Sequence, residues 1–430
     1  MSDINLCKFS GMCNKVLFIG SFLIFLTLFL NGQGATAKEN KRKLNTEIDS
    51  ILQSQVDLDK IPGAVIIIKK DDKVICRKAY GFAQKYDYSR KILEHKEKMT
   101  INHLFDIASL TKVIGTTTSI MLLSDKGLIR VDDPVFKYIK AFETPEKREI
   151  TIRHLLTHTA GLYEWYPMYY RASGKKESFR PIAELPLKFP IGEPRRYSDL
   201  GFVLLGEIIE VVSGLPLDQF MKQNIFQPLG MRNTTYNPLK AGGYKKIAST
   251  SDGNPYEKRM VYDSTLGFTV KEIDPASWNG WRNYILRGEV NDGNAWYANE
   301  GISGAAGLFS RADDLQMLVD MLLNKGMIGS KQFLSSKIIE DFLSKDEFKN
   351  GLGWMMDNTN SFMRNAPVGS FGHTGFTGTS IVVVPQENIS VILLINRQNT
   401  GLLENGDYYN VSPVRLQVFN AVMKYLSDNN

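Results

Sequence analysis

The chain has 430 residues, a formal net charge of +6 and 43% hydrophobic residues. A chain of this length can bury a large core, which excludes a small disulfide-stapled peptide. The basic residues are spread along the chain and form no stripe, which argues against binding of nucleic acid.

The first residues predict an export signal. Lys8 and Lys15 precede an apolar run at Val16–Leu30, and small residues follow at Ala35–Ala37. The run is shorter than the roughly 20 residues of a membrane-spanning helix, so we expect a signal peptide over residues 1–37. An uncleaved anchor is the alternative, and membrane contact is expected only through this segment.

Residue patterns after the signal predict hairpins near both ends of the chain. β-Branched runs pair Gly63–Lys69 with Lys73–Tyr80, and Thr379–Pro385 with Ile389–Asn396. Such strands imply one antiparallel sheet assembled from distant segments. Helices are expected at Leu44–Gln55, Thr111–Lys126, Ile152–His158, Leu200–Val212 and Val414–Leu426.

The helical pattern between the hairpins predicts an inserted lobe. We assign residues 38–125 and 300–430 to an α/β (α+β) lobe with an antiparallel sheet of about five strands or more, flanked by helices. Residues 126–299 would form the inserted helical lobe and the active-site loops. Weak periodicity at Gly242–Asn299 predicts long loops over a site in the crevice between the lobes.

One segment has the pattern of an activated serine. Ser109 follows the apolar approach Phe105–Ala108 and opens a predicted helix, with Lys112 three residues further on. The Lys112 amine can therefore reach the Ser109 hydroxyl, and a desolvated lysine with a lowered pKa can act as its base. The same spacing fits a helix-capping serine beside a solvated lysine, and Ser173–Lys176 repeats it in a polar stretch that we interpret as a loop.

Two further motifs follow in order, Tyr197-Ser198-Asp199 and His373-Thr374-Gly375. With Ser109-x-x-Lys112 they match the series Ser-x-x-Lys, Tyr-x-Asn, Lys-Thr-Gly of serine β-lactamases and penicillin-binding proteins. The chain thus resembles that family, and especially its class C-like branch, which commonly has His in the third motif. The likeness extends over nearly the whole chain after the signal and includes Ile152–Leu162, Gln227–Met231, Gly304–Leu315 and Gly372–Gly378.

The resemblance implies a β-lactamase/transpeptidase-like fold and acyl transfer to water through an acyl-serine, with no metal and no cofactor. Ser109 would attack the substrate carbonyl, and Lys112 and Tyr197 would carry the proton. The amides of Ser109 and Phe376 would form the oxyanion hole. The substrate-binding residues that it implies are Asp199, His373, Thr374, Gly375 and Phe376.

Two residues depart from the β-lactamase pattern. Asp199 stands in place of Asn, and its charge would favour protonated Lys112 and repel substrate carboxylates, although an acid is also favourable in a first helical turn. His373 stands in place of Lys and would make carboxylate binding dependent on pH. Both changes argue against an efficient β-lactamase.

The leading function implied by the resemblance is a D-alanyl-D-alanine carboxypeptidase of the penicillin-binding protein type. The export signal would place it in the bacterial cell envelope, secreted or periplasmic, where peptidoglycan stem peptides lie. The alternatives are a small-ester carboxylesterase, a weak β-lactamase, or a non-hydrolytic binding protein on the same fold. Intact Ser109, Lys112 and Tyr197 argue against the last.

Other conspicuous residues have structural explanations. His154 and His158 lie four apart but lack a third ligand, which argues against zinc. Gly301–Gly307 is interpreted as a tight turn before a helix, and Ser310–Asp313 as the capping box of that helix. Cys76 is predicted to be a small buried residue of a strand.

Overall fold

The computed structural model describes residues 38–172, 174–359 and 361–429. The predicted signal peptide over residues 1–37 lies outside the described residues. Residues 51–419 form one compact unit, and the described residues before and after them belong to a second. The sheet and the candidate site belong to the first unit.

The described chain opens with a helix over residues 38–57. The later helices are α2 (Thr118–Asp125), α3 (Ile152–Thr157), α4 (Arg180–Glu184), α5 (Asp199–Ser213), α6 (Leu217–Met221), α7 (Gln227–Leu229), α8 (Pro238–Ala241), α9 (Pro255–Tyr262), α10 (Ala312–Leu323), α11 (Ser336–Phe342) and α12 (Ser412–Ser427). The strands are β1 (Gly63–Lys70), β2 (Lys73–Tyr86), β3 (Ile92–Lys98), β4 (Phe105–Asp106), β5 (Thr235–Tyr236), β6 (Leu308–Ser310), β7 (Met327–Ile328), β8 (Lys331–Gln332), β9 (Phe371–Thr374), β10 (Ser380–Val384) and β11 (Ile389–Ile395).

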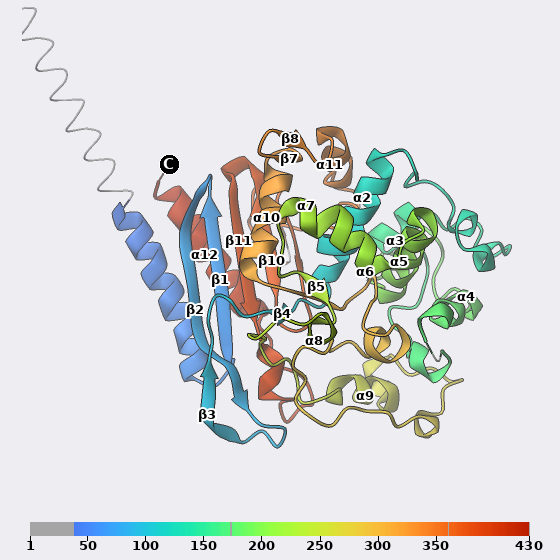
Figure 1. The fold of residues 1–430 in the computed structure, drawn as a ribbon, viewed down its shortest axis with the longest axis horizontal. Helices are drawn as coiled ribbons and strands as arrows, with labels where there is room; N and C mark the ends of the chain where they lie inside the picture. The colour runs from blue at the N-terminus through green and yellow to red at the C-terminus, as the bar shows by residue number, and fades with distance from the viewer. Residues whose placement is uncertain (1–37, 173, 360, 430) are drawn as a thin grey trace, which may run out of the picture. The chain divides into compact units, whose positions relative to one another are not determined.

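The largest sheet that the described residues form has the order β3-β2-β1-β11-β10-β9, with antiparallel neighbours (Figure 1). β1 is central, and its residues Gly63–Ile68 are all buried. A strand that is buried on both faces is expected to be a continuous apolar run, as this segment is. Ile67 pairs with Ile392 of β11 and with Arg77 of β2. The predicted hairpins, the joining of distant segments and the mixed helix and antiparallel-sheet fold class are confirmed.

Helix α10 packs across β1 and β11 (Figure 1). It buries Leu315, Leu318 and Leu322, whose helical spacing forms one apolar stripe. At its edge, Gln316 donates a hydrogen bond to the Ser390 hydroxyl at 2.9 Å. This helix fixes one face of the sheet.

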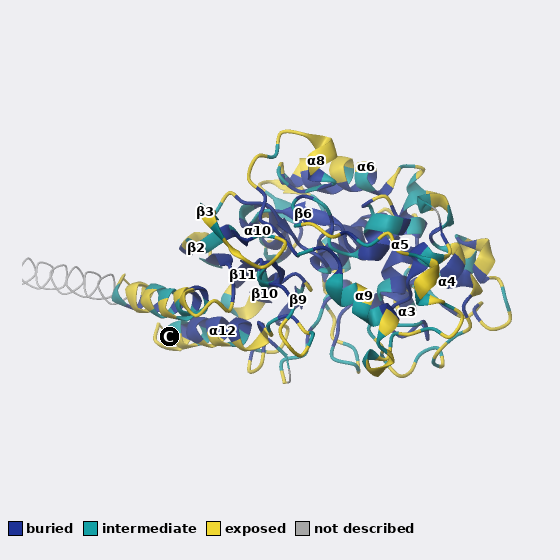
Figure 2. Ribbon diagram, turned by 90° about the horizontal axis from the view of Figure 1, so that it is seen from below, coloured by how far each residue is buried: buried dark blue, intermediate teal, exposed yellow. Residues whose placement is uncertain are grey.

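The helical region is centred on α5, which packs against α3 and α6. Nearly every residue of Leu200–Ile209 is buried, as Figure 2 shows by the dark colour along this helix. An apolar helix buried on most sides is typical of the core of a large protein. In the segment 242–299, α9 and short helical turns interrupt the predicted loops. The proposed lobe boundaries remain a prediction.

Two local predictions need correction. The predicted helix at Thr111–Lys126 contains a π-helical turn, η1 (Lys112–Thr117), before α2. The capping box at Ser310–Asp313 is wrong, because Ser310 ends β6 opposite Phe105, and Arg311 caps α10 without a side-chain bond. The Ser310 hydroxyl instead lies 2.8 Å from that of Thr234. The glycine-rich turn therefore leads into a short strand before the helix.

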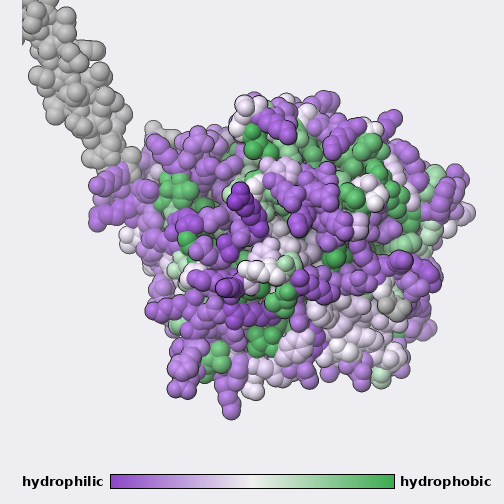
Figure 3. All heavy atoms as spheres, viewed as in Figure 1, coloured by the Kyte–Doolittle hydropathy of each residue, from purple (hydrophilic) through white to green (hydrophobic). Residues whose placement is uncertain are grey.

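The surface seen in Figure 3 is mainly hydrophilic, with small separate hydrophobic groups. In the described part of the chain no single helix is long and apolar enough to span a membrane, whereas Asp199–Ser213 and Leu217–Leu229, bent by 75°, meet that test only as a pair. Cys76 is buried in β2, as predicted.

Candidate active site

A strand, a sharp turn and a helix place Ser109. β4 pairs with β6, and Ala108 then adopts a left-handed backbone with φ of 45°. The Ala108 amide donates to Asp106 Oδ1 at 2.9 Å, which holds the turn closed. The chain becomes helical directly after Ser109, so the hydroxyl lies at a helix start, where the dipole favours negative charge.

Lys112 is buried beneath the serine. Its Nζ donates to Ser109 Oγ at 3.0 Å and to the Ala305 carbonyl at 2.8 Å, and it forms an ion pair with Asp199 Oδ1 at 2.7 Å. The predicted approach of amine to hydroxyl is thus present. The Ala305 carbonyl is a partner that spacing could not reveal, because it comes from a distant turn.

Lys112 is charged, whereas burial alone would favour its neutral form. Burial lowers its pKa, but the Asp199 carboxylate and Tyr197 outweigh burial and raise the pKa above its ordinary value. The lowered pKa expected from desolvation is therefore wrong, and the resting amine is an ammonium. Asp199 favours protonated Lys112, as its charge predicted.

Tyr197 lies directly beside this ion pair. Lys112 Nζ lies 5.3 Å from the centre of the Tyr197 ring. Burial raises the pKa of Tyr197, while the neighbouring ammonium and hydrogen bonding to Ser109 and Lys112 lower it in part. The phenol is thus protonated at neutral pH and close to both partners, as a proton carrier requires.

The His158 ring packs against the Tyr197 ring, a contact that the sequence did not predict. The two ring centres are 4.4 Å apart, and His158 Nδ1 accepts a hydrogen bond from the Ser198 amide at 3.1 Å. Burial and the charges of Arg195 and Lys112 lower the pKa of His158, so the ring is neutral. His154 instead forms a capping box with Thr151 at the start of α3.

The third motif lies against the serine segment. Thr374 ends β9, and the Gly375 amide bonds to the Thr379 carbonyl at 2.8 Å. A Cβ at Gly375 would lie 2.5 Å from the Ile107 carbonyl, so only glycine permits this approach. The hydroxyls of Thr377 and Thr379 donate to the carbonyls of Asp106 and Ile107, at 2.7 and 3.1 Å.

His373 is buried and uncharged. Burial, together with the Lys112 ammonium, lowers its pKa to about 3, and its Nδ1 lies 2.8 Å from the Thr374 carbonyl. That bond requires the proton on Nδ1, which leaves Nε2 as an acceptor. The predicted pH-dependent carboxylate binding by His373 is therefore wrong near neutral pH.

Phe376 follows the motif on a turn held by an arginine. Arg397 donates to the Phe376 carbonyl from Nε at 2.9 Å and from Nη2 at 2.7 Å. Within the described residues, the amides of Ser109 and Phe376 have no hydrogen-bond acceptor. Both remain available to a substrate oxygen, and their role as an oxyanion hole stays a prediction.

The comparison with known proteins completes this picture. The family model described as Beta-lactamase matches residues 48–414. The chain belongs to the β-lactamase family. It is accordingly an enzyme, a serine hydrolase of the β-lactamase fold, and the hypothesis of a non-hydrolytic binding protein is set aside.

Relatives within the family cover most of the chain. An N-acetylmuramyl-L-alanine amidase of Bacillus subtilis (strain 168) is 29% identical, covering 93% of this chain and 95% of its own length. A protein of Escherichia coli (strain K12) that is provisionally named as a D-alanyl-D-alanine carboxypeptidase is 32% identical, covering 84% of each chain. The solved structure of EstCE1, a hydrolase with promiscuous acyltransferase activity, superposes with a TM-score of 0.65 at 23% identity, over 89% of this chain and 99% of its own.

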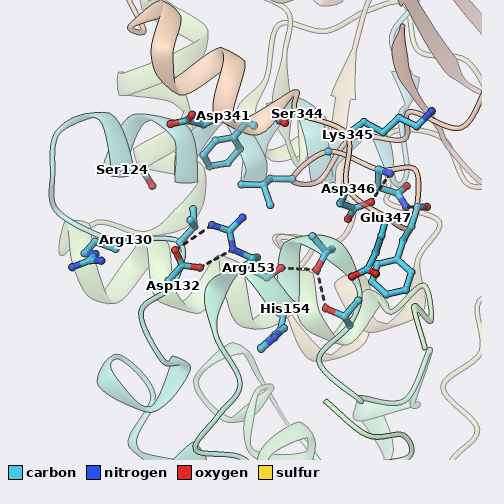
Figure 4. A pocket seen from close by; sticks show the side chains of 18 of the residues that line it. Ser124, Arg130, Asp132, Arg153, His154, Asp341, Ser344, Lys345, Asp346 and Glu347 are labelled. Carbon is cyan, nitrogen blue, oxygen red and sulfur yellow. Dashed lines mark hydrogen bonds and ion pairs between the residues drawn. The ribbon is translucent and has the colours of Figure 1, made fainter. Parts of the chain in front are cut away.

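This β-lactamase-family protein also has a cavity of about 780 Å³ beside α3 (Figure 4). Arg153 and His154 of α3 line it, and Arg153 is held by Asp132 through bonds of 2.6 and 3.1 Å. Neither Ser109 nor Lys112 lines this cavity, so we assign it no catalytic role. Within the described ranges no group of three or more His, Cys, Asp or Glu residues is arranged to hold a metal ion.

Proposed function

We propose that the protein is an exported hydrolase that removes the terminal D-alanine from peptidoglycan stem peptides through an acyl-serine. The observation that carries the proposal is the contact of Lys112 Nζ with both Ser109 Oγ and Asp199 in a buried site. The relative provisionally named as a D-alanyl-D-alanine carboxypeptidase supports the choice of substrate. The apolar and small-residue pattern of residues 1–37 supports export.

Acylation begins with loss of the serine proton. Because Lys112 is an ammonium, it first gives a proton to Asp199 or to a neighbouring acceptor and then takes the proton of Ser109 Oγ. The Oγ–carbon bond forms as the carbonyl π pair moves to oxygen, where the amides of Ser109 and Phe376 would stabilise the oxyanion.

Collapse of that intermediate releases the amine. The carbon–nitrogen bond breaks as the Tyr197 hydroxyl gives its proton to the departing D-alanine nitrogen. The Lys112 ammonium then returns a proton to the Tyr197 oxygen. Water then attacks the acyl carbon and gives its proton to Lys112; the bond between the acyl carbon and Ser109 Oγ breaks, and Oγ takes that proton from Lys112. The cycle balances without a cofactor: the proton taken from Ser109 leaves on the D-alanine nitrogen, and water supplies both the hydroxyl of the product acid and the proton that restores Ser109.

A second candidate is cleavage of the amide between N-acetylmuramic acid and L-alanine. It is favoured by the relative named as an N-acetylmuramyl-L-alanine amidase, which this chain matches over 95% of that relative's length. The same serine, lysine and tyrosine would perform the chemistry. A third candidate, hydrolysis of small esters, is favoured by the uncharged His373, since neutral substrates need no cation there.

The test compares three substrates with purified protein. One is an N-acylated peptide ending in D-alanyl-D-alanine, one a muramyl peptide and one a nitrophenyl ester. We expect release of free D-alanine, its loss in Ser109→Ala, and its persistence in Ser173→Ala, which alters the second Ser-x-x-Lys copy. Turnover of the ester or the muramyl peptide without release of D-alanine would contradict the proposal and identify the alternative.

A further inference from the structure

Two arginines hold the turn that presents the Phe376 amide. The Gly375 amide donates to the Thr379 carbonyl at 2.8 Å and closes this turn. Arg397, shortly after β11, donates to the Phe376 carbonyl from two nitrogens. Arg415, on α12, donates from Nη2 to the Gly375 carbonyl at 3.1 Å and to the Thr379 carbonyl at 2.9 Å. Both guanidinium groups are therefore bound to backbone oxygens of one short turn.

The charge of Arg415 is buried and has no carboxylate partner. Within the described residues no acid forms an ion pair with Arg415 or Arg397, whereas Arg77 is paired with Asp313 at 2.7 Å. Burial, together with the neighbouring Arg397 charge, lowers the pKa of Arg415 to about 9, so the group stays charged at neutral pH. A buried cation is costly unless good acceptors compensate it. The carbonyls of the turn supply that compensation.

The Gly375 carbonyl belongs to the same peptide group as the Phe376 amide. This peptide is trans, so its C=O and N–H point to opposite sides. The Arg415 cation therefore lies at the oxygen end, and the N–H end has no acceptor among the described residues. A hydrogen bond from a cation to a peptide oxygen polarises the group and strengthens its N–H as a donor.

Arg397 provides a matched comparison. It clamps the same turn, but the Phe376 carbonyl that it binds belongs to the next peptide group along the chain. If the two arginines only hold the turn in place, their removal should have similar effects. If polarisation of the Phe376 amide matters, Arg415 should have the larger effect.

We infer that Arg415 is a positioning residue of the oxyanion hole, which polarises the Phe376 N–H towards the substrate oxygen. Its benefit grows as negative charge develops on that oxygen in the transition state, so it should appear in kcat rather than in KM. The inference rests on the proposed acyl-serine reaction, but not on the identity of the substrate.

The first measurement compares nitrophenyl ester kinetics of Arg415→Gln, Arg415→Lys and Arg397→Gln. Glutamine can still donate to a carbonyl but is uncharged, whereas lysine keeps the charge. We expect Arg415→Gln to lower kcat roughly tenfold, less than the loss of about a hundredfold or more for an oxyanion donor itself, and to leave KM within about twofold. Arg415→Lys should recover part of kcat, and Arg397→Gln should lower kcat less than Arg415→Gln does.

The second measurement observes the peptide group directly and needs no turnover. In protein with isotopically labelled phenylalanine, NMR reports the amide nitrogen of Phe376, which is assigned from its absence in Phe376→Leu. Its resonance depends on hydrogen bonding at the preceding carbonyl, that of Gly375. We expect the resonance to move upfield in Arg415→Gln and to move less in Arg397→Gln.

Several results would overturn the inference. These are an unchanged kcat or resonance in Arg415→Gln, or equal changes in Arg415→Gln and Arg397→Gln, which would leave both arginines as clamps of the turn. If Arg415→Gln does not fold, Arg415→Lys takes its place with a smaller expected loss of kcat and a smaller upfield shift, and no change in either would have the same meaning.

Failure of the proposed function is seen independently. In that case wild type would release no D-alanine from the model peptide. The dependence of ester turnover and of the Phe376 resonance on Arg415 would nevertheless persist.

Discussion

The ion pair between Lys112 and Asp199 decides which group can take the serine proton. A lysine alone in this buried position would tend to be neutral, whereas the carboxylate 2.7 Å away holds it charged. The β-lactamase pattern has Asn at this position. The residue identity could be read from the sequence, but the size of its effect depends on the distance between two helix starts.

Asp199→Asn should therefore speed acylation. Removing the carboxylate lets burial lower the pKa of Lys112, so more neutral amine is present at pH 7. We expect labelling of Ser109 by penicillin to accelerate on the order of tenfold, measured by mass spectrometry over time. Asp218→Asn, which removes an acid from the first turn of α6, is the control and should change nothing. Slower labelling of Asp199→Asn would show that the carboxylate assists acylation.

His373 should not titrate in the working range of the enzyme. Its pKa of about 3 lies well below the unfolded value of 6.5, so the ring stays neutral as pH falls from 8 to 5 and gains a proton only near pH 3. The pH profile of kcat/KM for a neutral ester should keep its shape in His373→Asn between pH 5 and 8. An inflection near pH 6.5 that disappears in His373→Asn, but not in His95→Asn on β3, would show that the ring is charged.

At the scale of elements, long patterned segments were predictable and short ones were not. The β-branched run of β1 and the apolar spacing of α5 predict their own structures, because burial on a sheet or a helix face imposes a period. β4 and β6 have only two and three residues, too few to show a period. They exist because the Ser109 segment pairs with a distant turn, and local sequence does not encode that pairing.

Gly304 lies in that turn, close to the backbone of α5. An added Cβ would lie 2.1 Å from the Phe202 carbonyl, and the adjoining Ala305 carbonyl accepts from Lys112. Gly304→Ala should cost about 1–3 kcal/mol of unfolding free energy and lower kcat, as the turn must move. Urea denaturation and ester kinetics measure both effects. Gly174→Ala is the control, since its nearest atom would be 3.9 Å away; equal stability of both variants would refute the steric argument.

At the scale of the whole molecule, the export that we propose would determine which substrates the enzyme meets. If a signal peptidase cuts after Ala37, the mature protein begins at Lys38. We expect intact mass measurement of exported protein to give that N-terminus. Ala37→Arg should block the cut, because the position before it requires a small residue, and Thr36→Ser should not. Exported protein that keeps residues 1–37 would indicate the membrane anchor.

The threonine hydroxyls that join the turn between β9 and β10 to the Ser109 segment couple the stability of the site to that of the sheet. Thr377 and Thr379 bond to the two carbonyls before the serine turn, so the turn cannot open while the sheet is intact. Heat inactivation should then coincide with cooperative melting, and deuterium should enter this turn as slowly as it enters the central strands. The enzyme would lose its activity in one step, when the fold itself is lost.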